Sequence, residues 1–198
     1  MQQADLFDTA SGLPTGPEGL TYRSDVIDTA TEAHLIAAVD ALPLAPFRFQ
    51  GWLGKRLTCS FGWSYDFDTA QVAAAPPIPD WLMPIRRKAA ELLAIGEAEL
   101  VQALLIRYDP GAGIGWHRDR PIFGHVAGLS LGAPATLRLR RRRENGFDRH
   151  PVSLARRSLY GLSGPVRTLW EHSIAPMEDT RWSITFRSLT DKGRRLLG

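Results

Sequence analysis

A series of short apolar or alternating runs, from Val101 onward, limits the fold more than any other feature of the sequence. Glycine, proline, asparagine or charged turns separate the runs, and the helical spacing of the first half disappears. Such spacing indicates an antiparallel sandwich or barrel. The runs cover residues 101–108, 125–131, 135–140, 158–162, 169–174 and 182–189.

Two potential metal ligands, His117 and Asp119, lie between the first two runs. On an extended strand, residues i and i+2 point to the same face, so the imidazole and the carboxylate would project side by side. A second histidine, His172, follows downstream. Two histidines and one carboxylate suit a non-haem Fe(II) oxygenase, although the pair alone is more often a structural histidine beside a solvated aspartate.

The segment 181–187 alternates polar and apolar residues, as a strand with one buried apolar face does. Its polar face carries Arg181, Ser183, Thr185 and Arg187. Because the arginine fork matches the geometry of a carboxylate, two arginines on one face could hold an anion with two carboxylates. The alternative is a half-solvated strand with two surface arginines.

Together these segments resemble the AlkB family of Fe(II)/2-oxoglutarate-dependent dioxygenases, over about residues 45 to 190. The resemblance implies a double-stranded β-helix (jelly roll), mainly β with flanking helices. It also implies oxidative demethylation of N-alkylated nucleic-acid bases with Fe(II), 2-oxoglutarate and O2, releasing formaldehyde, succinate and CO2. The shared motifs are Arg107-Tyr108-x-Pro110-Gly111-x-x-Ile114-x-x-His117-x-Asp119, Leu129-Ser130-Leu131-Gly132-x-Pro134, His172, and Arg181-x-Ser183-x-Thr185-Phe186-Arg187.

The resemblance also implies roles for single residues. Arg181 binds the distal carboxylate of 2-oxoglutarate, helped by the hydroxyl of Tyr108. Arg187 lies near the carboxylate at the metal. The catalytic residues that bind Fe(II) are His117, Asp119 and His172.

Two positions depart from the most familiar family pattern. Ile106 stands where many members have asparagine. It cannot donate a hydrogen bond, so one co-substrate contact is lost or replaced by packing. Ser183 stands where some members have asparagine, and its hydroxyl can still donate. We therefore include Ser183 among the residues expected to bind 2-oxoglutarate.

The segment 45–67 interleaves basic and aromatic residues, the composition of a surface that holds phosphates and stacks bases. By resemblance, it corresponds to the family's nucleotide-recognition lid. Its candidate substrate-binding residues are Arg56, Phe61 and Tyr65. The alternative is an aromatic-rich sheet whose rings belong to the core.

The densest charge of the chain lies in residues 138–146, which end in a hairpin-turn pair, Asn145-Gly146. We predict that Arg142 and Arg143 form a rim that contacts substrate phosphates. The alternative is a solvated strand edge that its charge protects from aggregation.

The domain organisation follows from these patterns. Residues 1–19 are rich in glycine and proline and are expected to form a flexible arm. By resemblance, residues 20–198 are expected to form a single AlkB-like domain, with the lid at about 45–67 and the jelly-roll core at about 101–190. Helical segments precede the strands and should cover one sheet from outside.

The first of these helices should begin with a capping box formed by Thr29 and Glu32. The second should begin at Asp80. The remaining histidines are treated as structural or surface residues: His34, His125 and His150.

The net charge of +3 and the sequence pI near 9.3 suit a polyanionic partner. We expect alkylated DNA or RNA, with the target base single-stranded or flipped out. The single cysteine, Cys59, excludes an internal disulfide and favours a reducing cytoplasm. No signal peptide or membrane span is recognisable, so we expect a cytoplasmic monomer with no membrane partner.

Other functions stay open at this point. The same chemistry could act on a tRNA nucleoside or a protein side chain. A non-catalytic jelly roll could bind nucleic acid alone, although both arginines and the triad argue against it. A zinc hydrolase could use the same His2Asp set, but the arginines on the polar face of residues 181–187 would then have no role.

Overall fold

The computed structural model describes residues 16–49, 52–66 and 71–197. The helices are α1 Thr29–Asp40, α2 Met83–Leu93, α3 Gly164–Leu169 and α4 Asp191–Leu197, with short 3-10 helices η1 Asp80–Leu82 and η2 Glu97–Glu99. The strands are β1 Leu20–Arg23, β2 Ala45–Phe49, β3 Trp52–Phe61, β4 Trp63–Asp66, β5 Gln71–Ala74, β6 Leu100–Tyr108, β7 Ile114–His117, β8 Phe123–Gly132, β9 Ala135–Arg142, β10 Phe147–Leu154, β11 Ser158–Leu162, β12 Glu171–Ile174 and β13 Arg181–Leu189.

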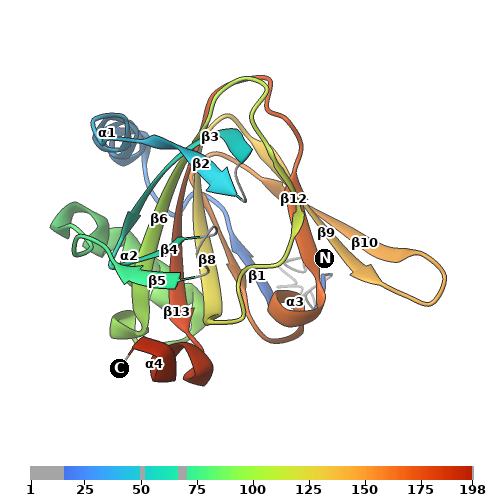
Figure 1. The fold of residues 1–198 in the computed structure, drawn as a ribbon. Coiled ribbons are helices and arrows are strands. Elements are labelled where there is room, and N and C mark those ends of the chain that lie inside the picture. The colour runs from blue at the N-terminus through green and yellow to red at the C-terminus, as the bar shows by residue number, and fades with distance from the viewer. Residues whose placement is uncertain (1–15, 50–51, 67–70, 198) are drawn as a thin grey trace, which may run out of the picture.

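Two antiparallel sheets make up the body of the molecule (Figure 1). The larger sheet has the order β1-β11-β8-β13-β6-β3-β2, and the smaller has the order β10-β9-β12-β7. Strands β4 and β5 pair with each other beside them. The fold is the mainly β architecture with flanking helices that the sequence predicted, which confirms that prediction.

Helices α1 and α2 cover the outer face of the larger sheet, as predicted (Figure 1). Leu35 and Val39 of α1 and Ile85 of α2 are buried in one apolar cluster with Ile184 and Phe186 of β13. Successive residues of a strand point to opposite faces, so the polar residues of β13 point away from the helices. Within the described ranges, no helix has the length and apolar character needed to cross a membrane.

The space between the two sheets is apolar in one part and polar in another. A second cluster joins Val126 and Leu162 of the larger sheet to Leu137 and Leu139 of the smaller sheet. Elsewhere the inner face of the larger sheet carries polar side chains that are also buried. Buried polar groups are costly unless they have partners, so this region is a candidate binding site for a polar ligand. These side chains are Ser130, Arg181, Ser183 and Thr185.

The start of α1 differs from its prediction. The N-cap residue is Asp28, whose Oδ1 accepts a hydrogen bond of 2.7 Å from the backbone N–H of Thr31. Glu32 forms no capping box; its buried carboxylate accepts a bond of 2.9 Å from the N–H of Gly132. Arg156 adds an ion pair at 3.1 Å to the same carboxylate. Glu32 thus ties α1 to the end of β8, a long-range contact that local sequence does not reveal.

Strands β2 and β3 form a hairpin in the segment predicted to be the lid. Strand β3 also pairs with β6, so the hairpin extends the larger sheet at its edge. The side chains of β3 therefore alternate between the inner face of the sheet and the face covered by helices.

Candidate metal and co-substrate site

Three potential metal ligands meet at the end of β7. His117 is the last residue of β7 and the register partner of His172 on β12, and their ring centroids lie 4.2 Å apart. Asp119 lies beyond the strand, with Oδ1 3.8 Å from Nε2 of His117. One ligand atom from each residue lies within 4.8 Å of the others. The structure thus brings the predicted triad together, but Asp119 reaches it from a loop.

Both imidazoles are held in the neutral form that binds metals. Burial, helped by the nearby His117, lowers the pKa of His172 to about 3. Burial also lowers the pKa of His117, against the attraction of Asp119. Nδ1 of His117 lies 2.9 Å from the carbonyl oxygen of Gly115. An N–H at Nδ1 donates to that carbonyl and leaves the lone pair of Nε2 for a metal.

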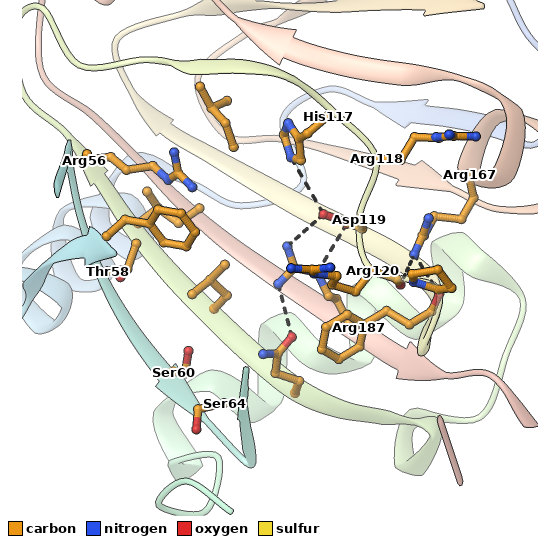
Figure 2. A pocket seen from close by; sticks show the side chains of 18 of the residues that line it. Arg56, Thr58, Ser60, Ser64, His117, Arg118, Asp119, Arg120, Arg167 and Arg187 are labelled. Carbon is orange, nitrogen blue, oxygen red and sulfur yellow. Dashed lines mark hydrogen bonds and ion pairs between the residues drawn. The ribbon is translucent and has the colours of Figure 1, made fainter. Parts of the chain in front are cut away.

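The Asp119 carboxylate faces Arg187 (Figure 2). Nε of Arg187 lies 3.3 Å from Oδ2 of Asp119, and Nη1 of Arg187 donates to Gln102 Oε1 at 3.1 Å. Burial alone would raise the pKa of Asp119, but the charge of Arg187 above all outweighs it and holds the pKa well below its usual range. The carboxylate is therefore ionised at neutral pH, as a metal ligand must be.

The guanidinium of Arg181 is buried and forms no ion pair with the residues that the structure describes. The side chain is fully buried, and its Nε donates to Ser130 Oγ at 3.1 Å. Its Nη1 and Nη2 have no hydrogen-bond partner in the described part of the chain. A buried unpaired cation costs several kcal/mol. The arrangement is therefore suited to a carboxylate, which an arginine binds through two parallel hydrogen bonds.

Two tyrosines lie near this guanidinium. The guanidinium carbon of Arg181 is 5.2 Å from the ring centroid of Tyr108. Tyr160 of β11 lies over Gly128, where a Cβ would come within 2.6 Å of the tyrosine hydroxyl oxygen. Burial raises the pKa of Tyr160 to about 12, against the charge of Arg181. Its hydroxyl therefore keeps its proton and remains a potential donor.

A cavity of about 1420 Å³ opens beside the triad. Arginines from several segments line it (Figure 2). Asp119 and Glu171 are the carboxylates among its described lining residues, so positive charge dominates. Arg181 lies further along β13 and is not part of this lining. The lining arginines are Arg56, Arg118, Arg120, Arg167 and Arg187.

These residues fit an iron centre with a dicarboxylate co-substrate. The triad offers two neutral imidazoles and an ionised carboxylate, and the unpartnered nitrogens of the Arg181 guanidinium can bind an anion. A family model described as the 2OG-Fe(II) oxygenase superfamily matches residues 51–194. The chain belongs to this superfamily. It is accordingly a dioxygenase that uses Fe(II), 2-oxoglutarate and O2, as predicted.

Relatives and solved structures support the AlkB-like assignment. The chain is 28% identical over 177 residues to the Mus musculus protein "tRNA (carboxymethyluridine(34)-5-O)-methyltransferase ALKBH8", covering 83% of this chain and 25% of that protein. The Xenopus tropicalis protein of the same name is 28% identical over 169 residues, with 82% and 26% covered. The chain thus spans about a quarter of the length of these curated relatives.

Two solved structures show the same fold at low sequence identity. OsALKBH1 matches with a TM-score of 0.64 and 16% identity, covering 86% of this chain and 96% of that one. A Pseudomonas putida prolyl-4-hydroxylase matches with a TM-score of 0.60 and 16% identity, covering 87% and 93%.

The predicted substrate-binding residues whose side chains the structure describes do not all lie at one place. Arg56 lines the cavity. Phe61, by contrast, packs against the apolar cluster beneath the helices, so the structure places it away from the cavity. The side chain of Tyr65 lies outside the described part of the chain. Arg142 and Arg143 are exposed near the β9–β10 turn and do not line the cavity.

Sequence reasoning missed other residues of the site. Ser130 holds Arg181, and Gln102 holds Arg187. Arg167 holds the loop that follows Asp119, because its Nη2 donates to the carbonyls of Arg120 and Phe123, each at 2.7 Å. His125, treated as structural, lines the cavity. Each of these contacts joins residues that are far apart in the sequence; only Ser130 lay in a quoted motif.

Proposed function

We propose that this dioxygenase removes methyl groups from ring nitrogens of nucleic-acid bases, such as 1-methyladenine and 3-methylcytosine, as a repair enzyme. The observation that carries the proposal is the arginine-lined cavity at the triad. Its volume of about 1420 Å³ exceeds that of an ordinary small-molecule site. Such a cavity has room for a base together with the phosphates on either side of it.

The chemistry of the lining suits a nucleotide. Arg56 lies over the ring of Phe47, with its guanidinium carbon 3.8 Å from the ring centroid. Arginine held on an aromatic ring is a common contact for phosphates and bases. Since a base inside a duplex cannot reach the triad, we propose a single-stranded or flipped-out base as substrate.

The chain's own residues have distinct tasks in this reaction. When bound, Fe(II) would activate O2, which is the oxidant, with 2-oxoglutarate as the co-substrate. One oxygen atom of O2 would enter succinate, formed together with CO2, and the other would hydroxylate the methyl group, which then leaves as formaldehyde. His117, Asp119 and His172 would hold the metal. Arg181 would bind the distal carboxylate of 2-oxoglutarate, with Tyr108 beside it. Ser183, Arg187 and Ile106 would border the rest of the co-substrate.

The test is the mass of a single-stranded oligonucleotide that carries one 3-methylcytosine, after incubation with protein, Fe(II), ascorbate and 2-oxoglutarate. The proposal predicts loss of one methyl group, and no change with His172→Ala. DNA and RNA versions of the same strand would show which is preferred. An unchanged mass for both, from protein shown to form succinate, would refute the proposed substrate.

A modified tRNA nucleoside is the second candidate. The curated relatives carry a tRNA-modifying name, and the arginine-lined cavity would serve that substrate equally well. An anticodon stem-loop with carboxymethyluridine in the same mass assay separates the two. A gain of one oxygen there, without demethylation of the oligonucleotide, would favour the tRNA substrate.

We also propose that the enzyme is a monomer that works in a reducing cytoplasm. The single cysteine, Cys59, is half-buried, and burial raises the pKa of its thiol, so it is a poor partner for disulfides. Sedimentation of the full chain at micromolar concentration tests the monomeric state.

A further inference from the structure

The outer face of the smaller sheet carries a row of arginines. Along β9, Leu137 and Leu139 are buried toward the larger sheet. Because side chains alternate along a strand, Arg138, Arg140 and Arg142 point to the other face. None of these arginines belongs to the triad or to the co-substrate site.

The neighbouring strand β10 adds to this charge. Arg149 is the register partner of Arg140, and Phe147 is the partner of Arg142. Like charges directly opposite each other destabilise a sheet. Glu171 compensates Arg140 through a bond of 2.6 Å, but Arg142 and Arg149 form no ion pair with any described residue. Fold stability alone therefore does not account for this arrangement.

On the other face of the same hairpin, two arginines share one carboxylate. Arg141 is the register partner of Asp148 and donates to its Oδ2 at 2.8 Å. Arg143 donates to the same oxygen at 2.6 Å. The hairpin thus pairs Arg141 and Arg143 with a carboxylate on one face and leaves Arg142 and Arg149 without an ion-pair partner among the described residues on the other.

Aromatic rings hold the arginines of the outer face in place. The guanidinium carbon of Arg140 lies 4.3 Å from the ring centroid of Trp116 and 4.5 Å from that of Phe147. Arg142 and Arg149 lie 5.5 Å and 5.6 Å from the Phe147 ring. A guanidinium stacked on a ring keeps its N–H groups directed outward in its own plane, where they can bind an anion with little loss of entropy.

This face is continuous with the mouth of the cavity. Trp116 immediately precedes His117 on β7, and Trp116 and Glu171 both line the cavity. From β7 to β10 the face crosses three strand spacings, roughly 14 Å. A nucleic-acid strand that leaves the cavity at Trp116 would therefore run directly onto the arginines.

We propose that this face binds the single-stranded nucleic acid that flanks the target base. The inference rests on the proposed function, because it requires a nucleic-acid substrate. Guanidiniums would contact phosphates and the rings would stack with bases, a combination that holds single strands without reading their sequence. The face consists of Trp116, Arg138, Arg140, Arg142, Phe147 and Arg149.

The test compares the double variant Arg142→Gln/Arg149→Gln with Arg143→Gln. Arg143 serves as the control, because it lies on the same hairpin but is paired with Asp148 on the other face. The phosphate contact that the sequence predicted for Arg143 is therefore not part of this proposal. The first readout is the affinity for an unmodified 12-nucleotide single strand at several salt concentrations. The second is demethylation of a 3-methylcytosine trinucleotide and of a 12-nucleotide strand.

We expect the double variant to bind the 12-nucleotide strand at least tenfold more weakly at low salt. Its slope of log K against log salt should fall by about 1.4, the value for two lost phosphate contacts on a single strand. The KM for the 12-nucleotide substrate should rise, while activity on the trinucleotide stays normal. Arg143→Gln should match the wild type throughout.

Other outcomes overturn the inference in distinguishable ways. If the wild type demethylates the trinucleotide but the double variant binds the longer strand as well as wild type does, this face is not the binding surface. An equal loss of affinity with Arg143→Gln would show that the total positive charge of the hairpin, and not this face, determines binding. Equally tight binding of a polyglutamate peptide, with the same dependence on both arginines, would assign the face to an acidic protein. A wild type that neither binds nor demethylates any strand would overturn the proposed function as well.

Discussion

Arg181 is a charged group held out of water with one hydrogen bond to a protein side chain, from Nε to Ser130. Its two outer nitrogens are buried without partners in the described residues. Replacing a buried ionic group with an apolar one of similar size often stabilises a protein. We propose that binding of the distal carboxylate of 2-oxoglutarate offsets this cost and explains why a charged residue stands at this position.

The variant Arg181→Met should therefore be more stable than the wild type without co-substrate, by about 1 kcal/mol or more. It should also lose the stabilisation by 2-oxoglutarate, which for wild type is about 2.7 kcal/mol at a hundredfold excess over Kd. Urea unfolding with and without 2-oxoglutarate measures both effects. A variant that is stabilised by 2-oxoglutarate as much as the wild type would refute the role of Arg181.

Tyr160 offers a second test at this scale. Its hydroxyl lies over Gly128 near the charge of Arg181, while Ile106 cannot supply the donor that asparagine gives at its position. We expect Tyr160→Phe to keep the fold, since the ring remains, and to weaken 2-oxoglutarate binding about tenfold or more, the worth of one hydrogen bond to a charged group. Titration calorimetry on the metal-free protein measures this. The control Tyr22→Phe, on an exposed ring of β1, should bind normally.

At the scale of elements, Glu32 joins three segments. Its carboxylate receives the N–H of Gly132 at 2.9 Å and ion pairs from Arg156 at 3.1 Å and Arg157 at 3.3 Å. Burial alone would raise the pKa of Glu32, but these partners together lower it. A lowered pKa means that the ionised carboxylate stabilises the fold above its usual titration range and that this contribution is lost as the pH falls.

Glu32→Ala should lower the free energy of unfolding by about 2 kcal/mol at pH 7, because it leaves a buried N–H without an acceptor. Glu32→Gln keeps an acceptor and should cost about half as much. The difference between wild type and Glu32→Gln should shrink as the pH falls below the usual pKa of a glutamate. Urea unfolding at pH 7 and pH 4 measures this difference in the free energy of unfolding. A difference that is larger at pH 4 than at pH 7 would contradict the role of the ionised Glu32 carboxylate.

Several elements could be predicted from the sequence because their own pattern determines them. Ser158–Leu162 is a strand with the predicted bounds, and the alternation of β13 correctly separated its apolar face from its polar face. Strand β10 was missed because its sequence is polar and contains Pro151; pairing with β9 makes it a strand. Phe61 was predicted to bind substrate from the composition of the lid segment. The alternation of side chains along β3 instead places it on the apolar face of the sheet.

At the scale of the whole molecule, each of the two sheets carries a different part of the candidate site. The larger sheet carries Arg181 and Arg187, the residues proposed to bind the co-substrate, and the smaller sheet carries His117 and His172, two of the candidate metal ligands. The grouping of His117 with Asp119, and of Arg181 with Arg187 on one strand face, was predictable because each pair lies in a short motif with fixed spacing, whereas His172 was added as a lone downstream histidine. The cavity and the outer face of the smaller sheet were not predictable, because they arise only where distant strands pair.

The most direct test of the central claim is the ratio of formaldehyde to succinate released with a single-stranded oligonucleotide that carries 3-methylcytosine. If the cavity positions a methylated base at the triad, succinate formation should rise on adding the oligonucleotide and the ratio should approach one. The unmodified strand should give no formaldehyde, and His172→Ala should give neither product. Succinate formed at the same rate with or without the methylated strand, with no formaldehyde, would contradict the account.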